Sequence, residues 1–124
     1  MSFEELISMD TENFFEWITY NFNTDMIDAV ETEDDMRQAS KMISRAIGNY
    51  SYLSSLLAYL KIKVRQEKRN KNKEICEDLI DKREVVQEMV DATKMLYNGI
   101  SRMVTIKIEI DKEMSMTDFK TGKN

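Results

Sequence analysis

A seven-residue apolar repeat runs through the middle of the chain. It continues for about four heptads, which is the pattern of helices that pack along a seam. Its positions are Met36, Ile43, Tyr50, Leu57 and Val64, interleaved with Ala39, Ala46, Leu53 and Leu60. Thr32 followed by Asp35 resembles a capping box and marks the start of the helix. We therefore expect a helix over residues 33–69, with hydrophobic packing that ends near Val64, because the seam becomes charged beyond it.

A second apolar stripe follows, and it predicts a second helix from about residue 74 to 113. It keeps helical spacing and includes Leu79, Val86, Met89, Val90, Leu96, Ile100, Met103, Val104, Ile110 and Met114. The segment RNKNK between the stripes contains Asn70 and Asn72, which tolerate turn conformations. The predicted fold class is all-α, a long antiparallel helical hairpin over residues 32–118. The β-branched residues of SRMVTIKIEI would also suit a strand, but the helical spacing favours a helix there.

The amino-terminal segment TENFFEWITYNF is crowded with aromatic side chains. Phe14, Trp17 and Ile18 fall at i, i+3 and i+4, which predicts a short amphipathic helix within an arm formed by residues 1–31. This helix either packs on the long helices or docks another protein. We expect a turn at residues 21–24 and a flexible tail over residues 119–124.

Composition limits the class of protein. With 124 residues, three glycines and no proline, the chain suits one domain of long helices. A lone cysteine, Cys76, and the absence of histidine exclude an intramolecular disulfide, a Cys/His zinc site and a Cys-His catalytic pair. The chain has no apolar run of membrane-spanning length, and its amino terminus is unlike a signal peptide. We expect a soluble cytoplasmic protein, in the host cytoplasm if viral, that is not an enzyme and uses no cofactor.

Charge is divided along the chain. Eleven of the 23 acidic residues lie within residues 1–36, which contain no Lys or Arg. The other twelve share residues 37–124 with all 18 basic residues, and the whole chain has a net charge of -5. Such asymmetry indicates an acidic arm beside a basic surface. The arm either folds back on the basic helix, or docks a basic partner or competes with nucleic acid for the protein's own basic face.

The basic surface is concentrated in KIKVRQEKRNKNK, residues 61–73, where seven basic residues accompany one acid. Those that share one helical face are Lys61, Arg65, Lys68 and Arg69, and those that widen it are Lys63, Lys71 and Lys73. Faces of this kind bind phosphate backbones by charge neutralisation and counterion release. The block therefore predicts nucleic-acid binding. The alternative is a solvated hairpin end whose charges only offset the acidic arm.

Three carboxylates at the start of the second stripe could in principle hold a metal. Glu74, Asp78 and Asp81 lie at helical spacing, and grouped oxygen ligands suit hard cations. They are interleaved with Lys73, Lys82 and Arg83. Ion pairs within the helix are therefore the prediction, and we expect no metal site.

The carboxy-terminal stretch LYNGISRMVTIKIEIDKEMSMTDFKTGK, residues 96–123, resembles the end of the T4-type phage recombination mediators, the UvsY family. The matching positions are Ser101, Arg102, Ile106 and Lys107. Earlier, NYSYLSSLLAYL resembles that family's helix with a Tyr-Ser pair, and Lys63 and Arg65 have the spacing of its single-strand DNA-binding element. The resemblance covers about the last two thirds of the chain. The acidic aromatic arm is a departure from the family pattern.

This resemblance implies a helical, ring-forming homo-oligomer that binds single-stranded DNA in recombination, repair and replication. It would contact a recombinase and a single-strand-binding protein, and load the former while displacing the latter. Arg102 and Lys107 would join the seven residues of the basic block as DNA contacts. The expected oligomer or partner contacts are Phe14, Trp17, Leu96, Ile100 and Met103. Tyr50, Tyr52 and Tyr59 could stack bases, although the seam position of Tyr50 suits the core.

Two other classes of function fit the residues. One is a small inhibitor or adaptor whose acidic arm mimics nucleic acid through Glu31, Glu33, Asp34 and Asp35. It predicts no affinity for DNA. The other is a structural coiled-coil subunit with neither activity. The mediator predicts salt-sensitive binding of single-stranded DNA that is lost when Lys61, Lys63, Arg65 and Lys68 are neutralised.

Overall fold

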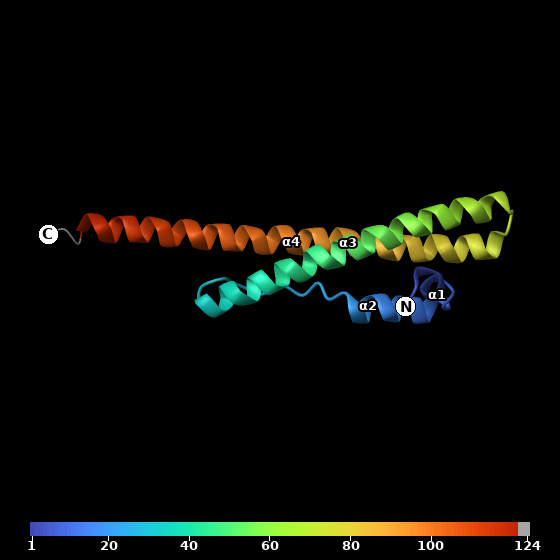
Figure 1. Ribbon diagram of the computed structural model, residues 1–124, viewed down its shortest axis with the longest axis horizontal. Helices are drawn as coiled ribbons and strands as arrows, with labels where there is room; N and C mark the ends of the chain where they lie inside the picture. Colours follow the sequence, from blue (N-terminus) through green and yellow to red (C-terminus); the bar gives the residue numbers. More distant parts are fainter. Residues whose placement is uncertain (122–124) are drawn as a thin grey trace.

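Two long helices pack side by side, and an amino-terminal arm with two short helices lies against them (Figure 1). The computed structural model describes residues 1–121, with side chains described for residues 1–116. The helices are α1 (Phe3–Ile7), α2 (Thr11–Asn21), α3 (Glu33–Arg69) and α4 (Lys73–Thr121). No strand occurs among the described residues, which confirms the all-α prediction and the helical assignment of SRMVTIKIEI.

The start of α3 is fixed by hydrogen bonds close to it in sequence. Thr32 Oγ1 accepts a hydrogen bond from the Asp35 backbone N–H at 3.1 Å. In return the Asp35 carboxylate accepts from the backbone N–H groups of Glu31 at 2.9 Å and Thr32 at 3.1 Å. These two backbone donors hold the pKa of Asp35 below its ordinary value of 3.8, because they favour the charged carboxylate. The predicted capping box and the predicted bounds of this helix are both confirmed.

The turn between the long helices lies at residues 70–72, within the predicted RNKNK segment. Lys71, not an asparagine, takes the left-handed backbone conformation, with φ at 57°. The Asn72 carbonyl then accepts from the Cys76 N–H at 3.0 Å, which opens α4. This helix continues to Thr121, beyond the expected end at 113 and into the predicted flexible tail. No proline or glycine interrupts the chain between Gly99 and Gly122, so nothing in the sequence stops the helix earlier. The rest of the predicted tail, residues 122–124, lies outside the described residues.

The predicted seam forms the core between α3 and α4. Ala39, Ala46, Leu53 and Leu60 are at most 1% exposed, and Val64 is the last buried residue of α3. On α4 the seam is filled by Leu79, Val86, Val90, Leu96 and Ile100. Tyr50 does not belong to this core, contrary to its predicted position. Its ring lies at the edge of the seam and is 38% exposed, while Leu53 fills the buried position of the next turn.

The arm contains two helices where one was predicted, because two caps divide it. Ser2 Oγ accepts from the Glu5 N–H at 3.1 Å, and Asp10 Oδ1 accepts from the Asn13 N–H at 2.8 Å. Both helices contribute fully buried side chains, Leu6 on α1 and Phe14 and Ile18 on α2, to the core of the long helices. Of the two roles predicted for the amphipathic helix, the structure shows the intramolecular one.

The last part of α4 projects beyond the start of α3 as a single helix (Figure 1). Met103 and Val104 are the last side chains that pack on the core near the start of α3. Further along, Ile106, Ile108, Ile110, Met114 and Met116 are between 45% and 61% exposed. We call residues 105–121 the free end of α4. No other helix of the described chain covers it.

Candidate nucleic-acid interface

The end of the hairpin presents basic side chains from α3, the turn and α4. Six of them are exposed and are here called the basic tip: Lys61, Arg65, Lys68, Arg69, Lys71 and Lys73. Among the side chains of residues 1–116, none of the six forms an ion pair. Exposed cations without an intramolecular partner remain free to bind an external anion.

Few acidic residues lie near the basic tip in the sequence. Over residues 61–77 the chain carries seven basic residues and three acids, Glu67, Glu74 and Glu77. The pattern on α3 is more extreme, because no Asp or Glu occurs between Asp35 and Glu67. Over that range α3 itself therefore contributes no carboxylate that would repel a phosphate backbone.

Lys63 differs from the basic tip, because the arm already occupies it. Its Nζ lies 3.3 Å from the Glu4 carboxylate, and the Tyr59 hydroxyl donates a hydrogen bond to the same carboxylate. The hydrogen bonds from Tyr59 and then Lys63 hold the pKa of Glu4 below its ordinary value. Conversely, the Glu4 carboxylate raises the pKa of both Lys63 and Tyr59. The acidic arm thus folds back in cis on one residue of the basic block.

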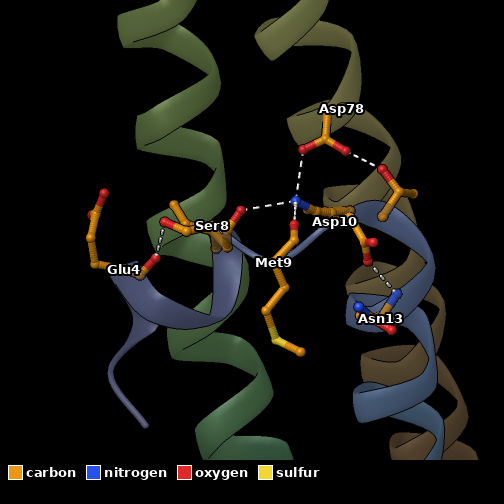
Figure 2. A network of polar contacts seen from close by, with 9 residues as sticks. Glu4, Ser8, Met9, Asp10, Asn13 and Asp78 are labelled. Carbon is orange, nitrogen blue, oxygen red and sulfur yellow. Dashed lines mark hydrogen bonds and ion pairs between the residues drawn. The ribbon is translucent and has the colours of Figure 1, made fainter.

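A buried lysine fastens the arm to α4. Lys82 is 1% exposed, and its Nζ donates to the backbone carbonyls of Ile7 at 2.8 Å and Met9 at 2.6 Å. The third partner is Asp78, at 2.7 Å, so all three ammonium donors are used. Figure 2 shows Met9 and Asp78 facing one nitrogen from the arm and from α4. The other Asp78 oxygen accepts from the Thr11 hydroxyl, which ties the start of α2 to the same point.

The Asp78–Lys82 contact confirms the predicted ion pair within the helix. The contacts of Lys82 with the arm were not predicted, since their partners lie 73 and 75 residues earlier in the chain. One feature of the sequence indicates that Lys82 needs such partners. Lys82 falls between Leu79 and Val86 at a seam position of α4. A lysine at such a position is buried, and burying its charge is costly unless the ammonium group has polar partners.

The structure does not bring Arg102 and Lys107 to the basic tip. At 1.5 Å per residue they lie about 40 to 50 Å along α4 from Lys73. Arg102 is exposed, and Lys107 pairs with Asp111 at 2.8 Å. One compact DNA-binding site within a single chain therefore cannot include both groups of predicted contacts.

The predicted oligomer contacts are mostly used inside the chain. Phe14 and Ile100 are 0% exposed and Leu96 is 7% exposed, while Trp17 and Met103 are partly buried. Because the arm packs around Phe14 and α3 covers Leu96 and Ile100, these three offer no surface to a partner. The exposed apolar side chains lie further along α4, on its free end.

Two of the three tyrosines proposed to stack bases are engaged by the arm. The Tyr52 ring lies 5.3 Å from that of Phe3 and 5.5 Å from that of Phe22, and burial raises its pKa. Tyr59 bonds to Glu4. Tyr50 is different, since the face of the hairpin that carries it is not covered by the arm. It remains partly exposed beside Lys94.

The acidic residues proposed for mimicry lie at the other end of α3, about 40 to 50 Å from the basic tip. Glu31, Glu33 and Asp34 are exposed, and Asp34 pairs with Arg37. Asp35 is committed to the helix cap. The acidic and basic clusters of this helix are therefore separate surfaces.

The described residues contain neither a metal-binding cluster nor a membrane-spanning helix. No cluster of three or more His, Cys, Asp or Glu side chains is arranged to hold a metal ion. None of the helices combines the length and apolar character needed to cross a membrane. No protein family model, curated protein or solved structure matches the chain.

Proposed function

We propose that the protein binds single-stranded DNA with its basic tip and acts as a recombination mediator that loads a recombinase. The observation that carries the DNA part is the group of six exposed cations at one end of an acidic protein, which form no ion pair with any side chain of residues 1–116. The mediator role, with a recombinase and a single-strand-binding protein as partners, rests on the resemblance of residues 96–123 to the UvsY family.

The size of the tip supports a flexible ligand and several copies of the chain. Two helices side by side measure only about 20 Å across, so one tip contacts few phosphates and binds weakly. Linking several tips in an oligomer would raise the overall affinity without new contacts. The exposed apolar residues of the free end of α4 favour this self-association, with Ile106, Ile110 and Met114 on one helical stripe.

The test is binding of labelled single-stranded DNA, followed by anisotropy at several salt concentrations. In the variant Lys61→Gln/Arg65→Gln/Lys68→Gln we expect weaker binding, with a salt slope smaller by about two, since each phosphate contact on a single strand contributes about 0.7. The matched control is Lys41→Gln/Arg45→Gln/Lys112→Gln, which removes three exposed cations away from the tip that are not among the predicted DNA contacts. Equal losses in both variants, or no binding by the natural sequence at low salt, would contradict the proposal.

The mediator part needs its own assay. We expect the protein to speed recombinase assembly on DNA already coated with single-strand-binding protein, and to form oligomers by light scattering. DNA binding without this acceleration would leave a DNA-binding protein of another role.

One observation favours nucleic-acid mimicry as the second candidate. Glu31, Glu33 and Asp34 form an exposed acidic cluster away from the basic tip. This function predicts no DNA affinity and a protein target whose binding is lost in Glu31→Gln/Glu33→Gln/Asp34→Asn.

A further inference from the structure

The face of the hairpin away from the arm contains an open groove between α3 and α4. Its volume is about 450 Å³. The residues that line it are Ile47, Tyr50, Thr93, Lys94, Tyr97 and Asn98. We call it the tyrosine groove. No residue of the arm lines it.

A volume of about 450 Å³ lies within the usual range of sites for small organic groups, about 300 to 1,000 Å³, so the tyrosine groove has room for a nucleobase. Tyr50 and Tyr97 border it from α3 and α4 and are 38% and 39% exposed. Lys94 Nζ lies 5.7 Å from the centre of the Tyr50 ring. Exposed aromatic rings beside a cation are the elements with which proteins stack the bases of single strands.

We propose that the tyrosine groove is a stacking site for a base of the single strand whose phosphates are held at the basic tip. This inference rests on the proposed function and adds a second contact to it. The phosphates supply charge attraction at the tip, and the rings of Tyr50 and Tyr97 bind a base further along the strand.

The heptad spacing of α3 places the groove and the tip on one path. Ile47, Lys61 and Lys68 are separated by multiples of seven residues, so they lie on the same stripe of a helix packed along a seam. Tyr50 and Lys61 are about 16 Å apart along the axis, which a few nucleotides can span. Between them the stripe carries the small side chains Ser54 and Ala58.

Charge complementarity selects nucleic acid as the occupant. The path along α3 contains no carboxylate between Asp35 and Glu67, and Lys94 adds a cation at the groove. Acidic residues occur on α4, where Glu84 and Asp91 are exposed. A strand that leaves the tip would therefore follow α3 and reach the groove from that side.

The test compares two labelled oligonucleotides of equal length and phosphate number, one normal and one with its bases removed at consecutive positions. The natural sequence should bind the normal strand about fivefold or more tightly than the abasic strand. The variant Tyr50→Leu/Tyr97→Leu should bind both strands equally, with an unchanged salt slope, because it loses no phosphate contact. Leucine retains apolar bulk in the groove, and circular dichroism checks that the variant remains helical.

The matched control is Tyr20→Leu, which removes an 88% exposed tyrosine from α2, outside the groove. It should retain the preference for the normal strand. Equal binding of both strands by the natural sequence would overturn the stacking site while leaving the phosphate contacts of the tip intact. No binding of either strand would instead overturn the proposed function. A lower molar mass of the double variant by light scattering would show that the groove is a contact between copies, and would also overturn the inference.

Discussion

The two faces of the α3–α4 hairpin carry similar side chains, but the arm covers those of one face and leaves those of the other exposed. On the face covered by the arm, residues with partners in the arm are Tyr52, Tyr59, Lys63 and Lys82. On the opposite face, Tyr50, Tyr97 and Lys94 line an open groove. Aromatic and basic content therefore does not by itself identify a binding surface on this protein. What distinguishes the faces is whether the chain's own amino terminus covers them.

The covered face is itself held in two unequal ways. Lys82 is buried, and each of its donors has an acceptor, so removing the side chain would leave buried polar groups without partners. The contact of Glu4 with Lys63 lies at the edge of the arm, where water and salt weaken ion pairs. The arm is thus firmly fastened at Lys82 and weakly held near the basic tip.

The largest expected effect is on stability, when the contacts of Lys82 with the arm are removed. Lys82→Met removes the donor to two arm carbonyls and leaves Asp78 without its cation, so we expect the free energy of unfolding to fall by about 3 to 5 kcal/mol. Urea unfolding followed by circular dichroism measures this. Lys94→Met is the matched control on the open face and should change stability by no more than about 0.5 kcal/mol. Equal effects of the two substitutions would contradict the role of Lys82 as the anchor.

A smaller loss of stability should follow when the pH is lowered and Glu4 becomes protonated. Because Tyr59 and Lys63 lower the pKa of Glu4 below 4.5, the contact stabilises the fold fully above that value and loses its effect as pH falls through the lowered pKa. Emission of Trp17, the only tryptophan, should report the loosened arm, since its ring lies 6.3 Å from that of Tyr52. Glu4→Gln should remove this acid transition. Glu5→Gln, an exposed neighbour, should keep it, and loss of the transition in both would point to another carboxylate.

The smallest effect is expected on DNA binding itself. Glu4→Gln releases Lys63 and should raise the affinity for single-stranded DNA about two- to fivefold at low salt, an advantage that fades as salt increases. Anisotropy titrations measure it, with Glu5→Gln as a control of equal net charge. If both substitutions raise the affinity equally, the cause is the overall charge of the arm and not the contact with Lys63.

Much of the helical framework was predictable because its signals are local. The cap at Thr32, the seam that ends at Val64 and the turn near Lys71 depend on residues within a few positions of one another. The end of α4 was predicted too early, since a fading apolar stripe does not stop a helix that lacks glycine and proline. The sequence also showed where positive charge is concentrated, and six of the seven cations of residues 61–73 are exposed. It did not show that the seventh, Lys63, pairs with Glu4.

The sequence by itself therefore determined that the protein is helical, where α3 begins and ends, and where its positive charge is concentrated. Only the tertiary structure decided which of the tyrosines and lysines are covered by the arm and which remain exposed. Tyr59 meets Glu4 across 55 positions and Lys82 meets Ile7 across 75, and no local pattern encodes such pairings. They follow from the way in which Leu6, Phe14 and Ile18 pack against one face of the hairpin, because burying these side chains brings the arm's carbonyls and carboxylate to that face.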